Sequence, residues 1–101
     1  CAVTGCQIPV MLRASHIKPW RDCVNAAERL SPDNGLMLSA NLDALFDRGL
    51  ISFDKNGSML VSSEISEFDQ NKLGLKNARL SKKPNEWQER YLSYHRNLFG
   101  F

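Results

Sequence analysis

The first half of the chain carries two short apolar segments separated by turn residues. Residues 9–17 are mostly apolar and follow a turn signal at 4–5, so we expect a strand there. Pro19 ends this strand, because proline cannot continue a central strand. A strong turn signal at 33–35 precedes the second apolar run, 36–38, which predicts another short strand.

A helix is expected directly after the second strand. Ser39 is a typical N-cap residue and Gly49 a typical stop, so the helix is predicted over residues 40–48. A further helical turn is expected around residues 25–30, in the polar stretch between the two strands. The predicted helix after Ser39 has an apolar stripe made of Leu42, Leu45 and Phe46.

The second half of the chain predicts a hairpin and two helices. Two apolar runs, 50–53 and 58–61, flank a polar turn sequence. A short helix is expected over 64–73, and a longer one opens near Pro84 and is closed by Gly100. Because no parallel strand–helix–strand repeat is visible, the fold class is predicted to be α+β. The longest helix has residues at helical spacing that predict its core face: Trp87, Tyr91, Tyr94 and Leu98.

Length and composition bound the class of protein. The chain has 101 residues, of which 43% are hydrophobic and 24% charged, so we expect a single folded domain over 1–101. No apolar run approaches the roughly 18 residues of a membrane span, and no secretory leader is recognisable. A cytoplasmic protein is expected. Because the chain begins at Cys1 without methionine, it is expected to be a piece of a longer protein with another domain.

Charge is unevenly distributed although the net charge is only +2. Residues 1–33 carry +1, residues 34–70 carry −4 and residues 71–101 carry +5. An acidic middle and a basic tail suit a protein that holds a cation centrally and a polyanion nearby. Chance variation in a small domain is the alternative interpretation.

The cysteines favour free thiols. There are three, an odd number, and no two of them have the Cys-x-x-Cys spacing. Neither a disulfide framework nor a structural zinc site of ordinary spacing is therefore predicted. The alternative is an irregular zinc site made by Cys1 and Cys6 with His16 or Cys23.

Four polar residues in apolar surroundings could carry chemistry. His16 ends the first strand, Asn34 lies in the turn before the second, and Asp43 and Asp47 share one face of the helix. Carboxylates can hold a divalent metal, a histidine can take a proton from an attacking water, and an asparagine can orient the imidazole. The alternatives are a packed histidine, an Asp pair that is solvated or shielded by Arg48, and an ordinary Asn-Gly turn.

In this order and spacing, the motifs resemble the HNH nuclease family, whose fold is the ββα-metal (His-Me finger) motif. The bacterial restriction-type subgroup is the most similar. The resemblance implies a ββα-metal core with an added β-hairpin and C-terminal helices. The segments that carry it are 1–5, 14–20, 34–38 and 42–54, with a weaker echo at 94–96.

The resemblance assigns roles to the four polar residues. It implies that His16 is the general base and that Asn34 orients it. Asp43 stands where the family has its final metal-binding histidine, and Asp47 stands where some members have a further ligand. Ser15 replaces the Asp or His that many members place before the base, and a hydroxyl is a weak ligand. A carboxylate set suits Mg²⁺, with Mn²⁺ as a substitute, better than zinc.

The implied activity is that of a metal-dependent DNA endonuclease, a phosphodiester hydrolase of restriction type. DNA is expected to be bound mainly through its phosphate backbone, and a double-strand break would need a homodimer or two successive nicks. The alternatives are a catalytically inactive nucleic-acid-binding module on the same fold and a small structural zinc module. The expected backbone contacts are Lys18, Arg21, Arg48, Lys82 and Lys83, together with Lys76 and Arg79.

The remaining histidine and the aromatic residues are expected to be structural. His95 lies beside the apolar stripe of the last helix, which favours a structural role or a phosphate contact over catalysis. The large aromatic side chains predict core packing rather than a platform for stacking bases; they are Trp20, Trp87, Tyr91 and Phe99.

Overall fold

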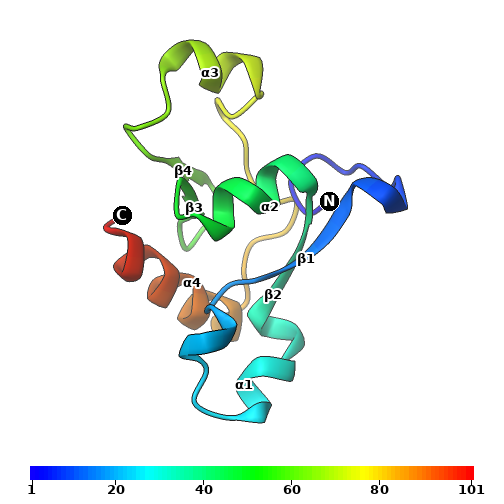
Figure 1. The fold of residues 1–101 in the computed structure, drawn as a ribbon, viewed down its shortest axis with the longest axis vertical. Coiled ribbons are helices and arrows are strands. Elements are labelled where there is room, and N and C mark those ends of the chain that lie inside the picture. Colours follow the sequence, from blue (N-terminus) through cyan, green and yellow to red (C-terminus); the bar gives the residue numbers. More distant parts are fainter.

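A computed structural model describes all of residues 1–101. The architecture is α+β, as predicted, with two separate two-stranded antiparallel sheets (Figure 1). None of the helices has the length and apolar character needed to span a lipid bilayer. The elements follow in the order β1 (Leu12–His16), α1 (Ala26–Leu30), β2 (Gly35–Ser39), α2 (Ala40–Asp47), β3 (Ile51–Phe53), β4 (Met59–Val61), α3 (Glu67–Lys72) and α4 (Glu86–Phe99).

The first sheet and the helix after it form the part of the fold that carries the candidate site. Strands β1 and β2 pair antiparallel, with Leu12 opposite Ser39 and His16 opposite Gly35. The chain between the two strands contains α1, which lies at the end of the sheet away from α2 (Figure 1). Helix α2 follows β2 without a loop and packs against both strands.

The predicted first strand is shorter than residues 9–17. Pro9–Met11 form a 3-10 turn, and pairing begins only at Leu12. Pro9 has a fixed φ and no backbone N–H, which suits the first position of a helical turn better than a ladder. The end of the strand before Pro19 is as predicted.

Helix α2 begins and ends close to the predicted bounds. It follows Ser39, but the Ser39 hydroxyl donates to Asn41 Oδ1 at 2.7 Å and caps no backbone N–H. Gly49 follows the helix with a φ of +71°, a left-handed conformation that favours glycine. Because the ring of Phe99 fills the space beside Gly49, a Cβ there would clash with it.

The second sheet is the predicted hairpin. Strands β3 and β4 pair antiparallel, and Asp54 Oδ1 accepts hydrogen bonds from the backbone N–H groups of Asn56 and Ser58 in the turn. The predicted helix over 64–73 is shorter, because the Ser66 side chain caps it by accepting from the N–H of Asp69. Helix α3 therefore spans only Glu67–Lys72.

Helix α4 has the predicted period but a different phase. Asn85 and Gln88 form a capping box at its start, and Gly100 ends it with a φ of +77°. The residues it buries fully are Leu92 and His95, whereas Trp87, at 58% exposure, faces solvent. The single core beneath the helices and sheets consists of Ile17, Leu36, Leu38, Leu42, Phe46, Ile51, Phe53, Leu75, Leu80 and Leu92.

Candidate active site

A cavity of about 490 Å³ lies where the end of β1 meets α2. Five of the residues that the sequence singled out line it together, from two elements and the loop that follows β1. They are Ser15, His16, Arg21, Asp43 and Asp47; the other lining residues are Ala14, Pro19 and Trp20.

The imidazole of His16 is held through one nitrogen only. Its Nε2 lies 3.0 Å from the backbone carbonyl oxygen of Arg29. Because a carbonyl can only accept, Nε2 is the nitrogen that carries the hydrogen. The edge of the Trp20 ring packs against the imidazole, with centroids 5.4 Å apart and planes at 86°. No protein group bonds Nδ1, whose lone pair is therefore available to a ligand in the cavity.

The two carboxylates of α2 have no partner within the protein. Asp43 lies in the first turn of the helix and Asp47 at its last residue, so both project from the same face. Neither makes a hydrogen bond or an ion pair, and Arg48 forms no pair with Asp47. The shielding of the Asp pair by Arg48 is therefore not what the structure shows, and both carboxylates remain available to a cation.

Ser15 precedes the histidine on β1 and is 4% exposed. Its hydroxyl makes no hydrogen bond within the protein and lines the same cavity. With Asp43 and Asp47 it gives a donor set made of oxygen, which suits Mg²⁺ or Mn²⁺ better than zinc. No three His, Cys, Asp or Glu side chains converge to hold a metal ion without further donors. The chemistry of these three oxygen donors suits a divalent cation. They do not fill its coordination shell, so water or substrate oxygens would have to complete it.

Asn34 does not make the direct contact with His16 that the sequence led us to expect. Its side chain is fully buried and points toward the loop after β1. Its Oδ1 accepts from the backbone N–H of Lys18 at 2.7 Å, and its Nδ2 donates to the carbonyl of Glu28 at 3.1 Å. The physical reason is position: Asn34 pairs through its own carbonyl with the N–H of Ile17, which places its amide beneath the loop. Asn34 therefore holds the backbone of the segment after His16 at two points, Lys18 and Glu28.

A comparison with known protein families matches the part of the chain that contains the cavity. The family model described as HNH endonuclease matches residues 1–54, just over half of the chain. The chain belongs to the HNH endonuclease family. The matched segment contains β1, β2, α2 and β3, and with them every protein group placed at the cavity so far. No curated protein gave a match.

Five of the basic residues predicted as phosphate contacts of this HNH domain occupy three different settings. Arg21 lines the cavity, its side chain 80% exposed, and Arg48 is exposed just beyond α2. Lys18 is different, because its ammonium is paired with Glu28 at 3.1 Å and its side chain is only 14% exposed. A phosphate contact by Lys18 therefore stays a prediction, and it would have to compete with this ion pair. Lys82 and Lys83 line a separate cavity, beside Leu36 and Leu80.

His95, the second histidine, is structural, as the sequence favoured. It is 1% exposed and stacks on Phe46 with ring centroids 3.9 Å apart. Its Nε2 lies 2.8 Å from the Phe46 carbonyl, and its Nδ1 lies 2.9 Å from Ser52 Oγ. Burial lowers the pKa of His95, more than the hydrogen bond to the Phe46 carbonyl raises it. The ring is accordingly a neutral part of the core.

The expectation of aromatic core packing is wrong for the two tryptophans. Trp20 is 52% and Trp87 58% exposed. The Trp20 side chain lines the cavity beside His16 instead of lying in the core. Its proximity to His16 could have been suspected from the motif, since only four positions separate them. The contact between His16 and the Arg29 carbonyl could not have been predicted, because every residue type has a backbone carbonyl.

The three cysteines are free thiols. Cys23 is buried, where its Sγ lies 3.5 Å from the Asn34 amide and donates toward the carbonyls of Lys18 and Pro19. This thiol fills the space under the loop and does not approach Cys1 or Cys6 as a metal ligand.

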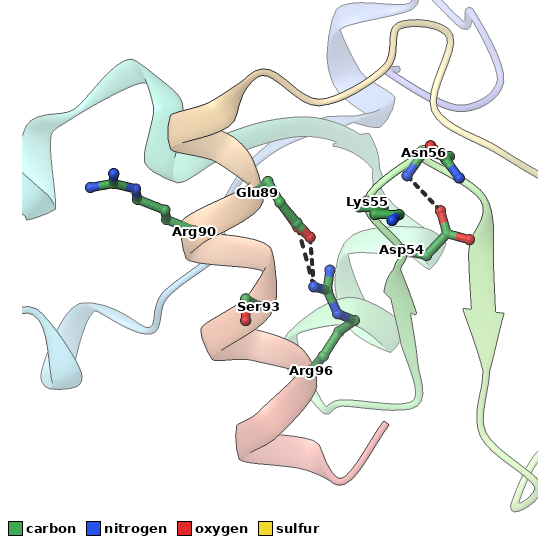
Figure 2. A pocket seen from close by; sticks show the side chains of 7 residues that line it. All are labelled: Asp54, Lys55, Asn56, Glu89, Arg90, Ser93 and Arg96. Carbon is green, nitrogen blue, oxygen red and sulfur yellow. Dashed lines mark hydrogen bonds and ion pairs between the residues drawn. The ribbon is translucent and has the colours of Figure 1, made fainter.

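A larger cavity of about 680 Å³ lies between the hairpin turn and α4 (Figure 2). Its most buried charges are neutralised, because Arg96 pairs with both carboxylate oxygens of Glu89. The Asp54 carboxylate is engaged by the turn backbone. The cavity contains no histidine or thiol, and its two carboxylates, Asp54 and Glu89, are both already bonded within the protein.

Proposed function

We propose that this HNH domain is a metal-dependent DNA endonuclease in which His16 is the general base. The observation that carries the proposal is an imidazole tied down at Nε2 and free at Nδ1, in a cavity it shares with two unpaired carboxylates. Strands β1 and β2 with α2 would then be the ββα-metal core of the fold. The motif resemblance supports a restriction-type role in the bacterial cytoplasm.

The hydrogen bond to Arg29 explains how His16 would act as a base. With the proton fixed on Nε2, the Nδ1 lone pair takes a proton from a water molecule in the cavity. The water oxygen forms a bond to phosphorus while the bond from phosphorus to the 3′ oxygen breaks. The leaving oxygen takes a proton from solvent, which gives 5′-phosphate and 3′-hydroxyl ends. The Trp20 edge limits rotation of the ring during this transfer.

Asp43, Asp47 and Ser15 would hold the divalent cation, Mg²⁺ or Mn²⁺. When bound, the cation supplies electrostatic stabilisation of the charge on the phosphate and on the leaving oxygen. Because the protein offers only these oxygen donors, DNA phosphate oxygens would complete the coordination. Affinity for the metal is accordingly expected to rise in the presence of DNA.

Arg21 and Arg48 are placed to contact phosphates that flank the cleaved bond. Both are exposed and neither is committed to a close ion pair; Arg21 Nε lies 3.7 Å from Asp22. Contacts of this kind bind without specifying sequence. Base recognition is therefore assigned to a separate domain of a longer chain. Each domain has one such cavity, so a double-strand break would need two domains or two successive nicks.

The experiment is cleavage of supercoiled plasmid with Mg²⁺, with Mn²⁺ and with EDTA. Wild-type protein is compared with Asp43→Asn and with the matched control Asp69→Asn, which removes an exposed, unpaired carboxylate of α3. We expect nicking that requires metal, a loss of about 10–100-fold in Asp43→Asn and no loss in Asp69→Asn. Equal cleavage in EDTA, or by Asp43→Asn, would refute the proposal.

A DNA-binding module without cleavage is the second candidate. It is favoured by the open donor set, in which no three ligands converge. This function predicts DNA binding that is unchanged in Asp43→Asn and no hydrolysis with either metal. The plasmid assay and a binding titration on the same proteins separate the two candidates.

A further inference from the structure

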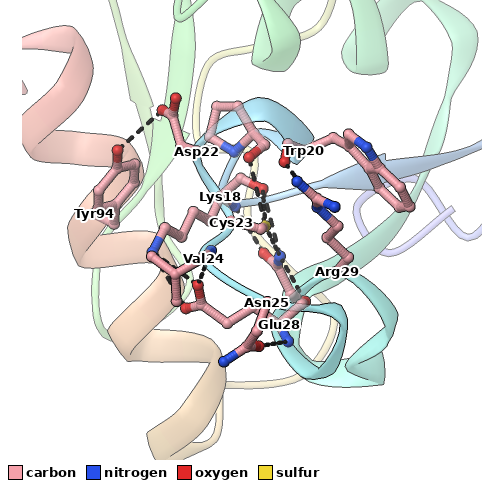
Figure 3. Close-up of polar contacts among 11 residues, drawn as sticks. Lys18, Trp20, Asp22, Cys23, Val24, Asn25, Glu28, Arg29 and Tyr94 are labelled. Carbon is pink, nitrogen blue, oxygen red and sulfur yellow. Dashed lines mark hydrogen bonds and ion pairs between the residues drawn. The ribbon is translucent and has the colours of Figure 1, made fainter.

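The carbonyl that fixes the His16 tautomer belongs to a very short helix. Helix α1 has five residues, and a helix of that length is not stable without tertiary contacts. The position of the Arg29 carbonyl therefore depends on whatever holds α1 against the rest of the domain. Figure 3 shows that a dense set of polar contacts surrounds this helix.

Glu28, the residue before Arg29, is bonded through all of its polar groups. Its carboxylate accepts from the backbone N–H of Val24 at 2.8 Å and from the ammonium of Lys18 at 3.1 and 3.2 Å. Its own N–H donates to the Asn25 side chain at 2.9 Å, and its carbonyl accepts from Asn34. The Arg29 carbonyl belongs to the next peptide group along the chain from the Glu28 carbonyl.

Lys18 supplies the positive charge that pairs with the Glu28 carboxylate. It lies two residues after His16, and its ammonium sits 4.8 Å from the centre of the Tyr94 ring of α4. The hydroxyl of Tyr94 donates to Asp22 at 2.9 Å, which anchors the same loop again (Figure 3). The ion pair with Glu28 thus joins the end of β1, helix α1 and helix α4.

The charges of this pair are mutually reinforced. The hydrogen bond from the Val24 N–H, followed by that from Lys18, lowers the pKa of Glu28. The hydrogen bond to Glu28 raises the pKa of Lys18. Both groups are therefore ionised at neutral pH.

The side chain of Arg29 contacts Trp20, which in turn contacts the imidazole of His16. Its Nε donates to the Trp20 carbonyl at 3.4 Å, and its guanidinium lies 5.1 Å from the centre of the Trp20 ring. The same ring packs edge-on against His16, whose Nε2 donates to the Arg29 carbonyl. A shift of α1 would disturb both contacts of the imidazole together.

We propose that the Lys18–Glu28 ion pair is a positioning clamp for His16. It fixes the Arg29 carbonyl and, through it, the tautomer that leaves Nδ1 free. The inference rests on the proposed function, in which His16 is the base. Glu28 and Lys18 are positioning residues, because neither lines the catalytic cavity.

The test measures the tautomer and the kinetics separately. Ring ¹⁵N shifts of His16 are recorded for wild type, Glu28→Ala and Lys18→Met, and kcat and KM for plasmid nicking are measured on the same proteins. The matched control is Glu67→Ala, which breaks the pair between Glu67 of α3 and Lys76 (2.9 Å); neither residue lines the cavity. Glu28→Gln is the conservative variant, since its amide oxygen can still accept from Val24 and Lys18.

We expect wild type and Glu67→Ala to show the Nε2–H tautomer alone, and Glu28→Ala and Lys18→Met to show a mixture. The kcat of these two variants should fall about tenfold with KM within about twofold, and Glu28→Gln should recover part of the loss. Lys18→Met keeps the Val24 bond to Glu28, so it reports on the ion pair even where Glu28→Ala loosens the loop. A single tautomer in both variants would overturn the clamp. A mixture of tautomers together with a wild-type protein that never cleaves would refute the nuclease and leave the clamp standing.

Discussion

The surroundings of the two histidines differ at one ring nitrogen. His16 and His95 each place Nε2 against a backbone carbonyl, of Arg29 at 3.0 Å and of Phe46 at 2.8 Å. In His95 the second nitrogen is occupied by Ser52. In His16 no protein group bonds the second nitrogen, and the residue lines a cavity.

The comparison shows how one residue type serves two purposes on one small domain. A backbone carbonyl sets the same tautomer in both rings. Burial and a hydroxyl partner then make His95 a core residue, whereas an open cavity with unpaired carboxylates makes His16 a candidate base. Each prediction below changes one side of this comparison.

The largest effect is expected from His16→Ala. Loss of a general base should reduce the cleavage rate by roughly 10²–10⁴-fold. The free energy of unfolding should change by no more than about 1 kcal/mol, because His16 is only half-buried and makes a single hydrogen bond. Single-turnover cleavage and urea unfolding of the same sample measure both quantities. Retention of the wild-type rate would remove His16 from the mechanism.

His95→Ala should have the opposite profile. It removes a buried ring, takes away one of the two hydrogen bonds of the Phe46 carbonyl and leaves the Ser52 hydroxyl without a partner, so we expect a loss of roughly 3 kcal/mol of stability. The folded fraction should still cleave DNA at close to the wild-type rate. A stable variant with strongly reduced cleavage would show that His95 acts in catalysis.

Two buried serines, one beside each histidine, should differ in how much their hydroxyl groups contribute to stability, and the expected effects are smaller. Ser52→Ala removes the partner of His95 Nδ1 and should cost about 1–2 kcal/mol of unfolding free energy. Ser15→Ala removes a hydroxyl that bonds no protein group and should leave stability within about 0.5 kcal/mol of wild type. Thermal unfolding of both variants checks this difference. Equal losses would mean that the His95 hydrogen bond contributes nothing specific.

The smallest effect is on the pH dependence of stability. Because burial lowers the pKa of His95 below its ordinary value of 6.5, the unfolded chain takes up a proton before the folded protein does. The stability contributed by the neutral ring is complete above that value and is lost as the pH falls toward the lowered pKa. Urea unfolding of wild type between about pH 7.5 and about pH 5.5 should show this loss, and His95→Gln should reduce it. An unchanged slope in His95→Gln would contradict the assignment.

Local patterns predicted much of the fold and the members of the site. Gly49 and Gly100 marked helix ends through left-handed conformations that few other residues adopt, and Ser39 marked the start of α2 although its side chain caps no backbone N–H. The sequence predicted that His16 and the two α2 carboxylates lie near one another. The apolar pattern placed His16 at the end of a strand, and helical periodicity placed both carboxylates on one face of the helix.

Contacts that involve backbone atoms or residues distant in the chain could not be predicted from the sequence. The amide of Asn34 bonds backbone groups and misses the imidazole, which residue type cannot reveal. The sequence gives no sign that Lys18 is paired, whereas in the structure its ammonium pairs with Glu28, ten positions away. The phase of α4 was missed because aromatic side chains such as Trp87 are amphipathic and suit either face.

The most direct test of the central claim is rescue of His16→Ala by imidazole. Because the free Nδ1 of His16 is the proposed proton acceptor, an imidazole molecule that enters the vacated cavity should restore part of the cleavage rate in proportion to its concentration. The Asp43→Asn variant serves as the control and should not respond, since it keeps its base. A His16→Ala protein that binds DNA yet stays at its basal rate at every imidazole concentration would contradict the role of His16 as the base.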